Sequence, residues 1–228
     1  MESKWTMTKK VMAVVGSNSY GTPMQHKYSY LNESMMLDGP RGLKEKPDLV
    51  VLTGGEDINP QMYGEKSIYP HAFYNNERDA LEKEWFLYAK ANKIPMVGVC
   101  RGMQMFTIMS GGRLLQHIEG HSRGGSHPVI TNEQKEVKVN SLHHQVCIPL
   151  SKSGHNVGAE LLAWSQTASD WKAGSEETEE LFVSFGCIPE AIWFPKIKAL
   201  GVQFHPEMMQ KDSEGYKYFQ DIFTKYIG

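Results

Sequence analysis

The amino-acid sequence predicts an α/β fold built on an open, mostly parallel β-sheet with helices on both faces. Short apolar runs rich in valine recur along the chain. Continuous runs of this kind are typical of strands that a parallel sheet buries on both faces. Segments with helical periodicity lie between or after these runs, which is the alternation expected of an open α/β sheet.

Each predicted strand ends beside glycine or a chemically reactive residue. The apolar runs occupy residues 11–15, 48–52, 94–99 and 199–204. They are followed in turn by Gly16, by Thr53-Gly54-Gly55, by Cys100-Arg101-Gly102 and by His205-Pro206-Glu207. Because ligands of open α/β sheets bind at the carboxyl ends of the strands, a functional site is expected at that edge.

Three segments with helical periodicity predict helices, at residues 77–92, 102–110 and 216–227. In the first helix Leu81, Trp85 and Tyr88 share one stripe, and Asn76 is the expected N-cap. The second is short and mostly apolar and stops at a glycine pair. The third carries its large apolar side chains on one face, so all three helices are expected to pack on the sheet.

The pattern is looser between residues 111 and 195. Residues 136–140 alternate in polarity and predict a half-exposed strand in a small antiparallel flap beside the main sheet. Residues 170–180 are acidic and almost without apolar side chains, which favours a solvated surface insertion. We expect a single domain over residues 1–228.

Composition excludes several classes of protein. The 228 residues include 24 Lys and Arg against 26 Asp and Glu, so the net charge attracts neither nucleic acid nor an anionic membrane. Three cysteines do not make a disulfide scaffold in so long a chain. No apolar stretch approaches the roughly 18 residues of a membrane helix, and residues 1–10 lack the apolar core of a secretory signal. A soluble cytoplasmic protein is therefore expected.

Gly98-Val99-Cys100-Arg101-Gly102 has the form of a nucleophile elbow, with sulfur in place of the serine oxygen. A nucleophile on a sharp strand-to-helix turn has strained dihedral angles, and the flanking glycines are expected to keep the approach of substrate clear. The helix that follows favours thiolate over thiol. Most free cysteines are buried and structural, and Cys147 and Cys187, which lack this context, are expected to be of that kind.

A thiolate nucleophile needs a base, and the base needs an orienting group. His205 and Glu207 follow the last predicted strand, and side chains two residues apart in an extended segment point the same way. His-x-Glu alone is a weak signal, as is a glycine pair after a strand. Beside the elbow, however, His205 and Glu207 supply a base and a carboxylate for Cys100. The amides at the glycine pair and of Arg101 are placed to hold an oxyanion.

Residues 53–55 (Thr-Gly-Gly), 98–104 (Gly-x-Cys-x-Gly-x-Gln) and 204–207 (Phe-His-Pro-Glu) together resemble the class I glutamine amidotransferases. Residues 52–60 with 63–65, residues 139–145 and the Cys-Arg-Gly-Met-Gln form of the elbow are similar to the γ-glutamyl hydrolase branch. That branch is peptidase C26, with its γ-glutamyl-γ-aminobutyrate hydrolase-like proteins. The likeness runs from about residue 11 to residue 207, and the combination of motifs in this order is highly specific.

The resemblance implies a flavodoxin-like core and a covalent γ-glutamyl thioester. Cys100 would attack the γ-carbonyl of a small γ-glutamyl substrate, and His205 would pass the proton to the departing amine and later activate water. Glu207 would orient His205, and the amides of Gly55 and Arg101 would hold the oxyanion. The substrate-binding residues would be Gly54, Gln104, His143 and His144. No cofactor is expected for this reaction.

Two features depart from the family pattern. The chain leaves little room between the first strand and Thr53 for the usual helix and second strand, so a trimmed sheet edge is expected. The acidic segment 170–180 is also longer than the family's connection before Glu190. Neither departure touches the predicted triad.

Other kinds of site have weaker support. His117, His121 and His127 lie close in sequence, and histidines at i and i+4 can share a metal on a helix. Glycines at 120, 124 and 125 break such a helix, however, and no His-Glu-x-x-His motif occurs, so packed or solvated histidines and no metal site are expected. The chain also has no Gly-x-Gly-x-x-Gly motif and no Walker lysine, which argues against a nucleotide-binding module.

Three functional hypotheses remain open. The chain is a free-standing hydrolase of γ-glutamyl amides, a glutaminase subunit that delivers ammonia to a separate synthetase partner, or a regulatory protein that keeps the fold without turnover. The intact Cys-His-Glu set argues against the third, because a scaffold has no need of all three groups.

Overall fold

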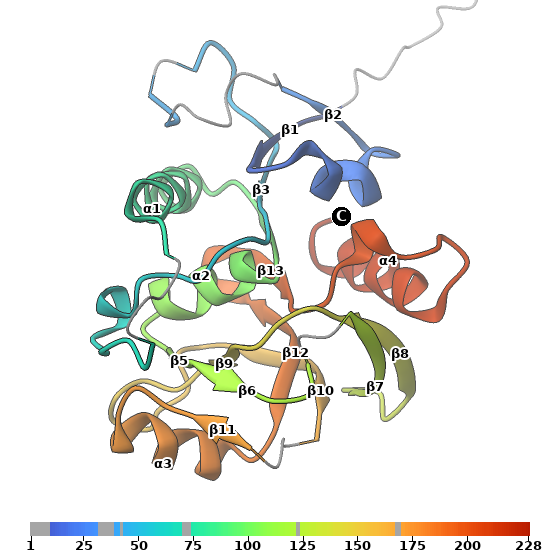
Figure 1. Ribbon diagram of the computed structural model, residues 1–228. Coiled ribbons are helices and arrows are strands. Elements are labelled where there is room, and N and C mark those ends of the chain that lie inside the picture. Colours follow the sequence, from blue (N-terminus) through green and yellow to red (C-terminus); the bar gives the residue numbers. More distant parts are fainter. Residues whose placement is uncertain (1–9, 32–38, 42, 70–73, 122–123, 167–169) are drawn as a thin grey trace, which may run out of the picture.

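A computed structural model describes residues 10–31, 39–41, 43–69, 74–121, 124–166 and 170–228 (Figure 1). The expectation about a secretory signal therefore lies, apart from Lys10, outside the described residues. The helices are α1 (Asn76–Ala91), α2 (Arg101–Met109), α3 (Glu176–Phe185) and α4 (Glu214–Tyr226). The strands are β1 (Lys10–Val15), β2 (Tyr28–Tyr30), β3 (Leu49–Leu52), β4 (Met96–Val99), β5 (Arg113–Leu115), β6 (His117–Ile118), β7 (Gly125–Thr131), β8 (Glu136–Ser141), β9 (Val146–Ile148), β10 (Glu160–Ser165), β11 (Trp171–Lys172), β12 (Ile188–Phe194) and β13 (Ala199–Val202). Short 3₁₀ helices include η1 (Asn18–Met24), η3 (Pro60–Tyr63), η4 (Pro195–Ile197) and η5 (Pro206–Met208).

The central sheet has nine strands in the order β2-β1-β3-β4-β13-β12-β10-β7-β8. The first five strands are parallel to one another, and the pairs from β13 to β8 are antiparallel. The four apolar runs are β1, β3, β4 and β13, which lie side by side, so their carboxyl ends share one edge. The predicted α/β fold is thus confirmed.

Helices cover both faces of the parallel strands (Figure 1). Ala13 and Val50 pack in a cluster with Trp85 of α1 and with residues of α2, whereas their neighbours Val14 and Val51 pack in a second cluster with residues of α4. Successive strand side chains point to opposite faces. Burial of both sets explains why the strands read as unbroken apolar runs.

The helix at 77–92 begins one residue earlier than expected. Asn75, and not Asn76, is the N-cap of α1, because its side-chain Oδ1 accepts hydrogen bonds from the amides of Glu77 and Arg78 at 3.0 and 3.1 Å. The sequence has two consecutive asparagines, Asn75 and Asn76, and did not determine which of them is the N-cap. Among the described residues, none of the helices has both the length and the apolar character that crossing a bilayer requires.

The predicted strand at 136–140 lies in β8, and its side chains alternate in burial as expected. It pairs antiparallel with β7, but the β7–β8 hairpin continues the main sheet through β10 instead of forming a separate flap. At the opposite end of the sheet, the described chain between β1 and β3 contains η1 and the three-residue β2, so that edge is short. The hairpin therefore extends the sheet on the side of β13, where the His205 strand lies.

Most of the acidic segment 170–180 is exposed or half-buried, in keeping with the predicted solvated surface segment, but it has regular secondary structure. It contains β11, which pairs with β6, and the first half of α3. Ser175 caps this helix by accepting a hydrogen bond from the Thr178 amide at 3.2 Å. Acidic residues at a helix N-terminus are stabilised by the helix dipole, so the charge run marks a helix start, and the Phe182 side chain of α3 is fully buried.

Candidate active site

Cys100 lies at the junction of β4 and α2 in a strained backbone conformation. Its φ is 52° and its ψ is −106°, a combination that costs a residue with a side chain about 1–3 kcal/mol. The Cys100 amide donates to the Val202 carbonyl at 2.7 Å, and the residue is 7% exposed. The structure thus has the predicted elbow, with the thiol at the carboxyl end of a central strand.

The flanking glycines are required by packing within the elbow. A Cβ at Gly98 would lie 2.5 Å from the carbonyl carbon of Gly102, and a Cβ at Gly102 would lie 2.3 Å from the Leu52 carbonyl oxygen. Strand and helix backbones therefore approach too closely for any side chain. The sequence suggested that these glycines clear the approach of substrate, and the observed contacts give a different reason.

His205 and Glu207 form the pair that the sequence predicted. His205 Nδ1 lies 2.8 Å from Glu207 Oε1, and the two side chains are 7% and 4% exposed. A carboxylate only accepts, so Nδ1–H donates and the other ring nitrogen is left for chemistry. That atom, Nε2, and Glu207 Oε2 are buried without a hydrogen-bond partner among the described residues.

The electrostatics of His205 favour its charged form. Burial lowers the pKa of His205, but the interactions with Cys100 and Glu207 outweigh burial and raise it to about 9. The imidazolium is therefore stabilised in the presence of an adjacent thiolate and carboxylate. This is the protonation state from which a histidine can supply a proton to a leaving group.

Asn140 is a site residue that sequence analysis did not assign. Its Oδ1 accepts from the His205 amide at 2.8 Å, and its Nδ2 donates to the His205 carbonyl at 2.9 Å. This two-point contact joins the end of β8 to the segment after β13. Asn140 lies inside the 139–145 motif, so the resemblance to the γ-glutamyl hydrolase branch did single out its segment. The sequence did not reveal that Asn140 contacts the His205 backbone.

Tyr20 and Gly54 pack against the histidine ring. The Tyr20 and His205 ring centroids are 5.9 Å apart. A Cβ at Gly54 would lie 2.7 Å from the Tyr20 hydroxyl and 3.0 Å from His205 Cε1. Burial, followed by the negative charges of Glu207 and Cys100, raises the pKa of Tyr20 to about 12, so this hydroxyl stays protonated. The structure thus places Gly54 within the site, against the predicted base.

Arg78 holds the glycine-pair loop. Its Nη2 donates to the Gly54 carbonyl at 2.7 Å, and its Nη1 lies 2.5 Å from Glu56 Oε2. A Cβ at Gly55 would lie 2.0 Å from Arg78 Nη1. The loop amides predicted to face an oxyanion are therefore held in place by an arginine of α1, a contact that no local pattern revealed.

The Arg101 side chain is fully buried in the same network. Its Nη2 donates to Asp79 Oδ1 at 2.6 Å, and its Nε donates to both carboxylate oxygens of Glu82 at 3.1 Å. Its Nη1 donates to the carbonyls of Glu56 and Asp57. Burial lowers the pKa of Arg101, but Glu82 and Asp79 outweigh burial, so the net shift is upward. The sequence predicted a role only for the Arg101 amide and did not reveal that the side chain joins α1 to the loop.

The predicted substrate-binding residues separate into different surroundings. Gln104 is buried in α2, one turn after Cys100. His144 Nε2 lies 3.1 Å from Asp57 Oδ2, and this hydrogen bond raises the pKa of His144. His143 contacts His121 and Glu190 instead, so the two neighbouring histidines belong to different clusters.

All three cysteines are free thiols. Cys147 is buried as expected, whereas Cys187 is only partly buried. Cys147 is fully buried, and burial raises its pKa to about 12; burial also raises the pKa of Cys187 to about 11. Neither is favoured as a thiolate at neutral pH.

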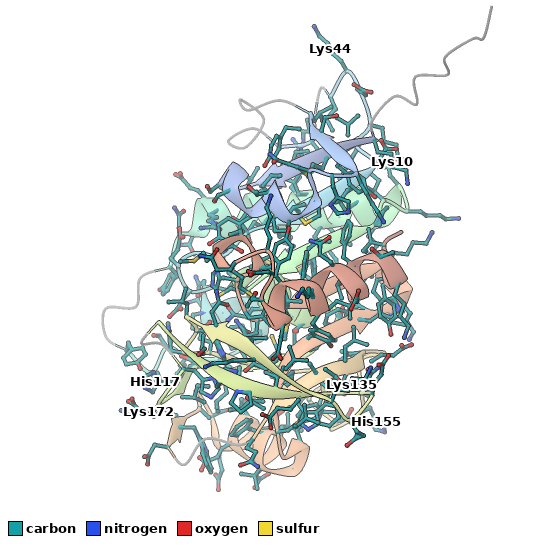
Figure 2. The ribbon with its side chains drawn as sticks, turned by 90° about the vertical axis from the view of Figure 1, so that its right-hand side faces the viewer. Lys10, Lys44, His117, Lys135, His155 and Lys172 are labelled. Carbon is teal, nitrogen blue, oxygen red and sulfur yellow. The ribbon has the colours of Figure 1, made fainter. Side chains whose placement is uncertain are left out.

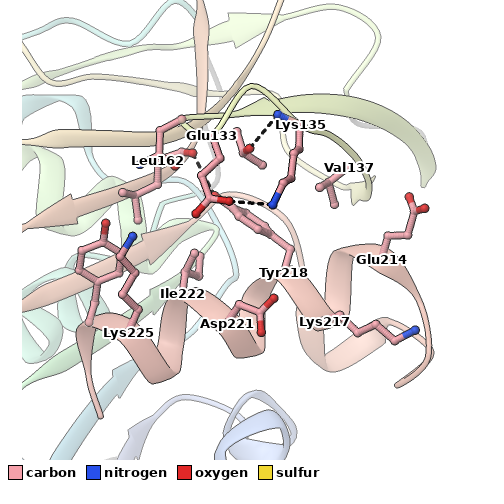
Figure 3. A pocket seen from close by; sticks show the side chains of 13 residues that line it. Glu133, Lys135, Val137, Leu162, Glu214, Lys217, Tyr218, Asp221, Ile222 and Lys225 are labelled. Carbon is pink, nitrogen blue, oxygen red and sulfur yellow. Dashed lines mark hydrogen bonds and ion pairs between the residues drawn. The ribbon is translucent and has the colours of Figure 1, made fainter.

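One groove on the surface lies apart from this site. It has a volume of about 310 Å³ and lies between the β7–β8 turn and α4, with a Glu133–Lys135 ion pair of 2.9 Å on its rim (Figure 3). Cys100, His205 and Glu207 are absent from its lining.

Comparisons with known proteins bear on the family and the fold of the chain. The family model described as Peptidase C26 matches residues 41–160, a region that includes Cys100 but ends before His205. A glutamine amidotransferase-like protein of Rickettsia prowazekii is 27% identical over 224 residues, covering 81% of this chain and 80% of the relative.

Solved structures share the fold. A glutamine amidotransferase from Thermotoga maritima matches with a TM-score of 0.54 and 16% identity, over 95% of this chain and 84% of that one. The glutaminase domain of Trypanosoma brucei CTPS with bound acivicin matches with a TM-score of 0.54 and 15% identity, over 95% and 93%.

Proposed function

The chain belongs to the peptidase C26 family of glutamine amidotransferase-like proteins, and from this premise we propose that it hydrolyses γ-glutamyl amide bonds through a thioester on Cys100. One observation carries the proposal. The Cys100 thiol is held on a strained elbow beside His205, and the Nδ1 atom of His205 lies 2.8 Å from the buried Glu207 carboxylate. Nucleophile, base and orienting group thus occur in one place.

In the first half of the proposed reaction, His205 Nε2 already holds the proton, and Cys100 Sγ attacks the γ-carbonyl carbon as a thiolate. The carbonyl oxygen becomes an oxyanion, which the amides of Gly55 and Arg101 hold. When the tetrahedral intermediate collapses, the C–N bond breaks and the His205 imidazolium gives its proton to the departing amine. The product is the γ-glutamyl thioester.

In the second half, His205 takes a proton from water, which attacks the thioester carbonyl. The C–S bond breaks, which restores the Cys100 thiolate beside the His205 imidazolium, and a γ-carboxylic acid leaves. Throughout both halves Glu207 fixes the histidine tautomer, and Asn140 fixes the histidine backbone through its two hydrogen bonds. Arg78 and Arg101 keep the oxyanion loop at α1.

A second candidate function is a glutaminase subunit that delivers ammonia to a synthetase. The fold shared with the glutaminase domain of CTPS supports it. Both candidates use the same half-reaction at Cys100, and they differ in the leaving group and in the need for a partner.

The test is amine and ammonia release by the purified chain alone, from glutamine and from a panel of γ-glutamyl amides, with Cys100→Ala as the blank. We expect Cys100-dependent release that is faster from γ-glutamyl amides than from glutamine. No release from either, with a Cys100 thiol that still reacts with iodoacetamide, would favour the synthetase-dependent subunit. Release that persists in Cys100→Ala would contradict the proposed chemistry.

A further inference from the structure

A second group of titratable side chains lies outside the proposed triad. Its members are His121, which follows β6, His127 on β7, His143, which follows β8, and Glu190 on β12; we call it the Glu190 cluster. The Glu190 and His143 side chains are 0% and 1% exposed, and those of His121 and His127 are 12% and 19% exposed. The proposed reaction uses none of these side chains, so their convergence on one buried carboxylate needs a separate explanation.

The donor atoms of the Glu190 cluster are spaced as in a tetrahedral metal site. His121 Nδ1 and His143 Nε2 are 3.2 Å apart, and they lie 3.8 and 3.6 Å from Glu190 Oε1. Ligand atoms of a tetrahedral Zn²⁺ ion with bonds near 2.05 Å are separated by about 3.3 Å. The three atoms therefore already form one face of such a tetrahedron.

The surroundings orient the histidines as ligands. His143 Nδ1 lies 3.0 Å from the Gln145 carbonyl; a carbonyl only accepts, so Nδ1 carries the proton and Nε2 presents a lone pair to the cluster. The His121 backbone is fixed as well, because its carbonyl accepts from Ser141 Oγ at 2.7 Å and from the His143 amide at 3.1 Å. Ser165 Oγ donates to Glu190 Oε1 at 3.1 Å. Outer contacts of this kind hold ligand side chains in position in metal sites.

The ligand types also suit a cation. A buried carboxylate beside imidazoles is the ligand chemistry that Zn²⁺ prefers. Glu190 Oε2 is moreover buried and lacks a hydrogen-bond partner among the described residues.

We propose that His121, His143 and Glu190 bind a divalent transition-metal ion of the Zn²⁺ class. His127 Nε2 lies 2.8 Å from Glu190 Oε1, but His127 is not one of the three residues whose ligand atoms lie together. His117, the third histidine singled out in the sequence, is not a member. It lies 2.9 Å from Glu119 and pairs with Lys172 across β6 and β11 (Figure 2).

The position of the cluster assigns the ion a structural role next to the triad. The Glu190 carbonyl accepts from the Gln203 amide at 2.8 Å, two residues before His205. Ser141, which bonds the His121 backbone, directly follows Asn140, which bonds the His205 backbone. Metal binding would thus tie the segments after β6 and β8 to β12, close to the contacts that hold the His205 segment. A protonated histidine paired with Glu190 is the competing account, and it requires no metal.

The test measures Zn²⁺ binding to the full chain in a Cys100→Ala background, so that a catalytic thiol cannot supply the site. After dialysis against a chelator, we expect one Zn²⁺ per chain by calorimetry and metal analysis, and a higher midpoint of thermal unfolding with Zn²⁺ than without. His121→Gln and Glu190→Gln should each weaken binding by more than the roughly 10–100-fold that loss of an outer contact costs. His155→Gln is the matched control, since His155 is exposed and lies outside the cluster (Figure 2).

Absence of stoichiometric Zn²⁺ binding in Cys100→Ala would overturn the proposal, as would unchanged affinity in His121→Gln. If Glu190→Gln does not fold, His121→Gln and the visible spectrum of the Co²⁺-loaded chain decide the matter. A tetrahedral Co²⁺ spectrum that is lost in His121→Gln supports the site, and an octahedral, aquo-like spectrum overturns it. Because the background protein has no nucleophile, none of these outcomes depends on the proposed hydrolase activity.

Discussion

Cys100 has a backbone conformation that its surroundings must hold in place. Its amide bonds the Val202 carbonyl, and the backbones of Gly98 and Gly102 meet within the elbow. A residue at φ 52° and ψ −106° is retained where packing over-determines it. In this conformation Cys100 lies just beyond the end of β4, where the predicted base His205 also lies.

Gly102→Ala should destabilise the protein, because its Cβ would lie 2.3 Å from the Leu52 carbonyl oxygen. We expect a loss of about 1–3 kcal/mol in the free energy of unfolding, measured in urea. Gly125→Ala is the control, since a Cβ there meets nothing within 4 Å, and it should change stability by no more than about 0.5 kcal/mol. Equal effects of the two substitutions would show that the elbow is not tightly packed.

The pH dependence of kcat/KM tests the roles of His205 and Glu207. With a pKa of about 9 for His205, the imidazolium that protonates the departing amine is lost as pH rises through that value, so kcat/KM should fall there. Glu207→Gln removes one of the interactions that raise this pKa, so the alkaline limb should move to lower pH. Its rate should fall about 10–100-fold less than that of His205→Ala, since orientation costs less than the base itself.

The control for this pH profile is Glu133→Gln, which changes an exposed carboxylate on the groove beside α4. Its alkaline limb should coincide with that of the unmodified chain. An alkaline limb that stays in place in Glu207→Gln would mean that Glu207 does not set the protonation of His205. Losses of equal size in Glu207→Gln and His205→Ala would show that tautomer control is as important as the base.

The junction between α1 and the glycine-pair loop depends on two arginines. Arg101 reaches from the first residue of α2 to Asp79 and Glu82 on α1, and Arg78 reaches from α1 to the Gly54 carbonyl. Each bond spans 19 to 24 residues of sequence. The elbow, the helix beside it and the oxyanion loop are therefore held as one unit by buried charges.

Arg101→Leu should leave Asp79 and Glu82 without their buried partner and cost about 3–5 kcal/mol of unfolding free energy. Arg41→Ala is the matched control, since Arg41 pairs with Glu84 at 2.8 Å but has a side chain that is 90% exposed. That pair should contribute less than about 1 kcal/mol. Chemical denaturation of both variants measures the difference, and a small effect of Arg101→Leu would show that the loop is held by other contacts.

Much of the parallel half of the molecule could be predicted from the sequence because its signals are local. Strands buried on both faces appear as apolar runs, and the elbow and His-x-Glu motifs are each contained within five residues. The Arg78 and Arg101 contacts could not be predicted, because they join surfaces that only the folded chain brings together. The helix start at Ser175 was missed because its acidic residues resemble a solvated charge run, although Ser175 in front of them is an N-cap signal.

The antiparallel half of the sheet brings together the histidines that sequence spacing could not group. His121 and His127 were considered with His117, whereas the fold places them with His143 and Glu190, from after β8 and from β12. The Glu190 carbonyl then accepts a hydrogen bond from the amide of Gln203, which follows β13 and lies two residues before His205. The two buried groups of charges, one proposed to react and one proposed to bind metal, are thus supported by the same strands.

The most direct test of the central claim compares γ-glutamyl amide hydrolysis by Cys100→Ala and Cys187→Ala. Cys100→Ala should lower the rate by at least about 10⁴-fold with an unchanged unfolding transition, because no other thiol or hydroxyl is assigned to attack the carbonyl. Cys187→Ala, which removes a free thiol elsewhere in the chain, should keep the rate of the unmodified protein. Hydrolysis by Cys100→Ala at the unmodified rate would contradict the assignment of the nucleophile and the mechanism built on it.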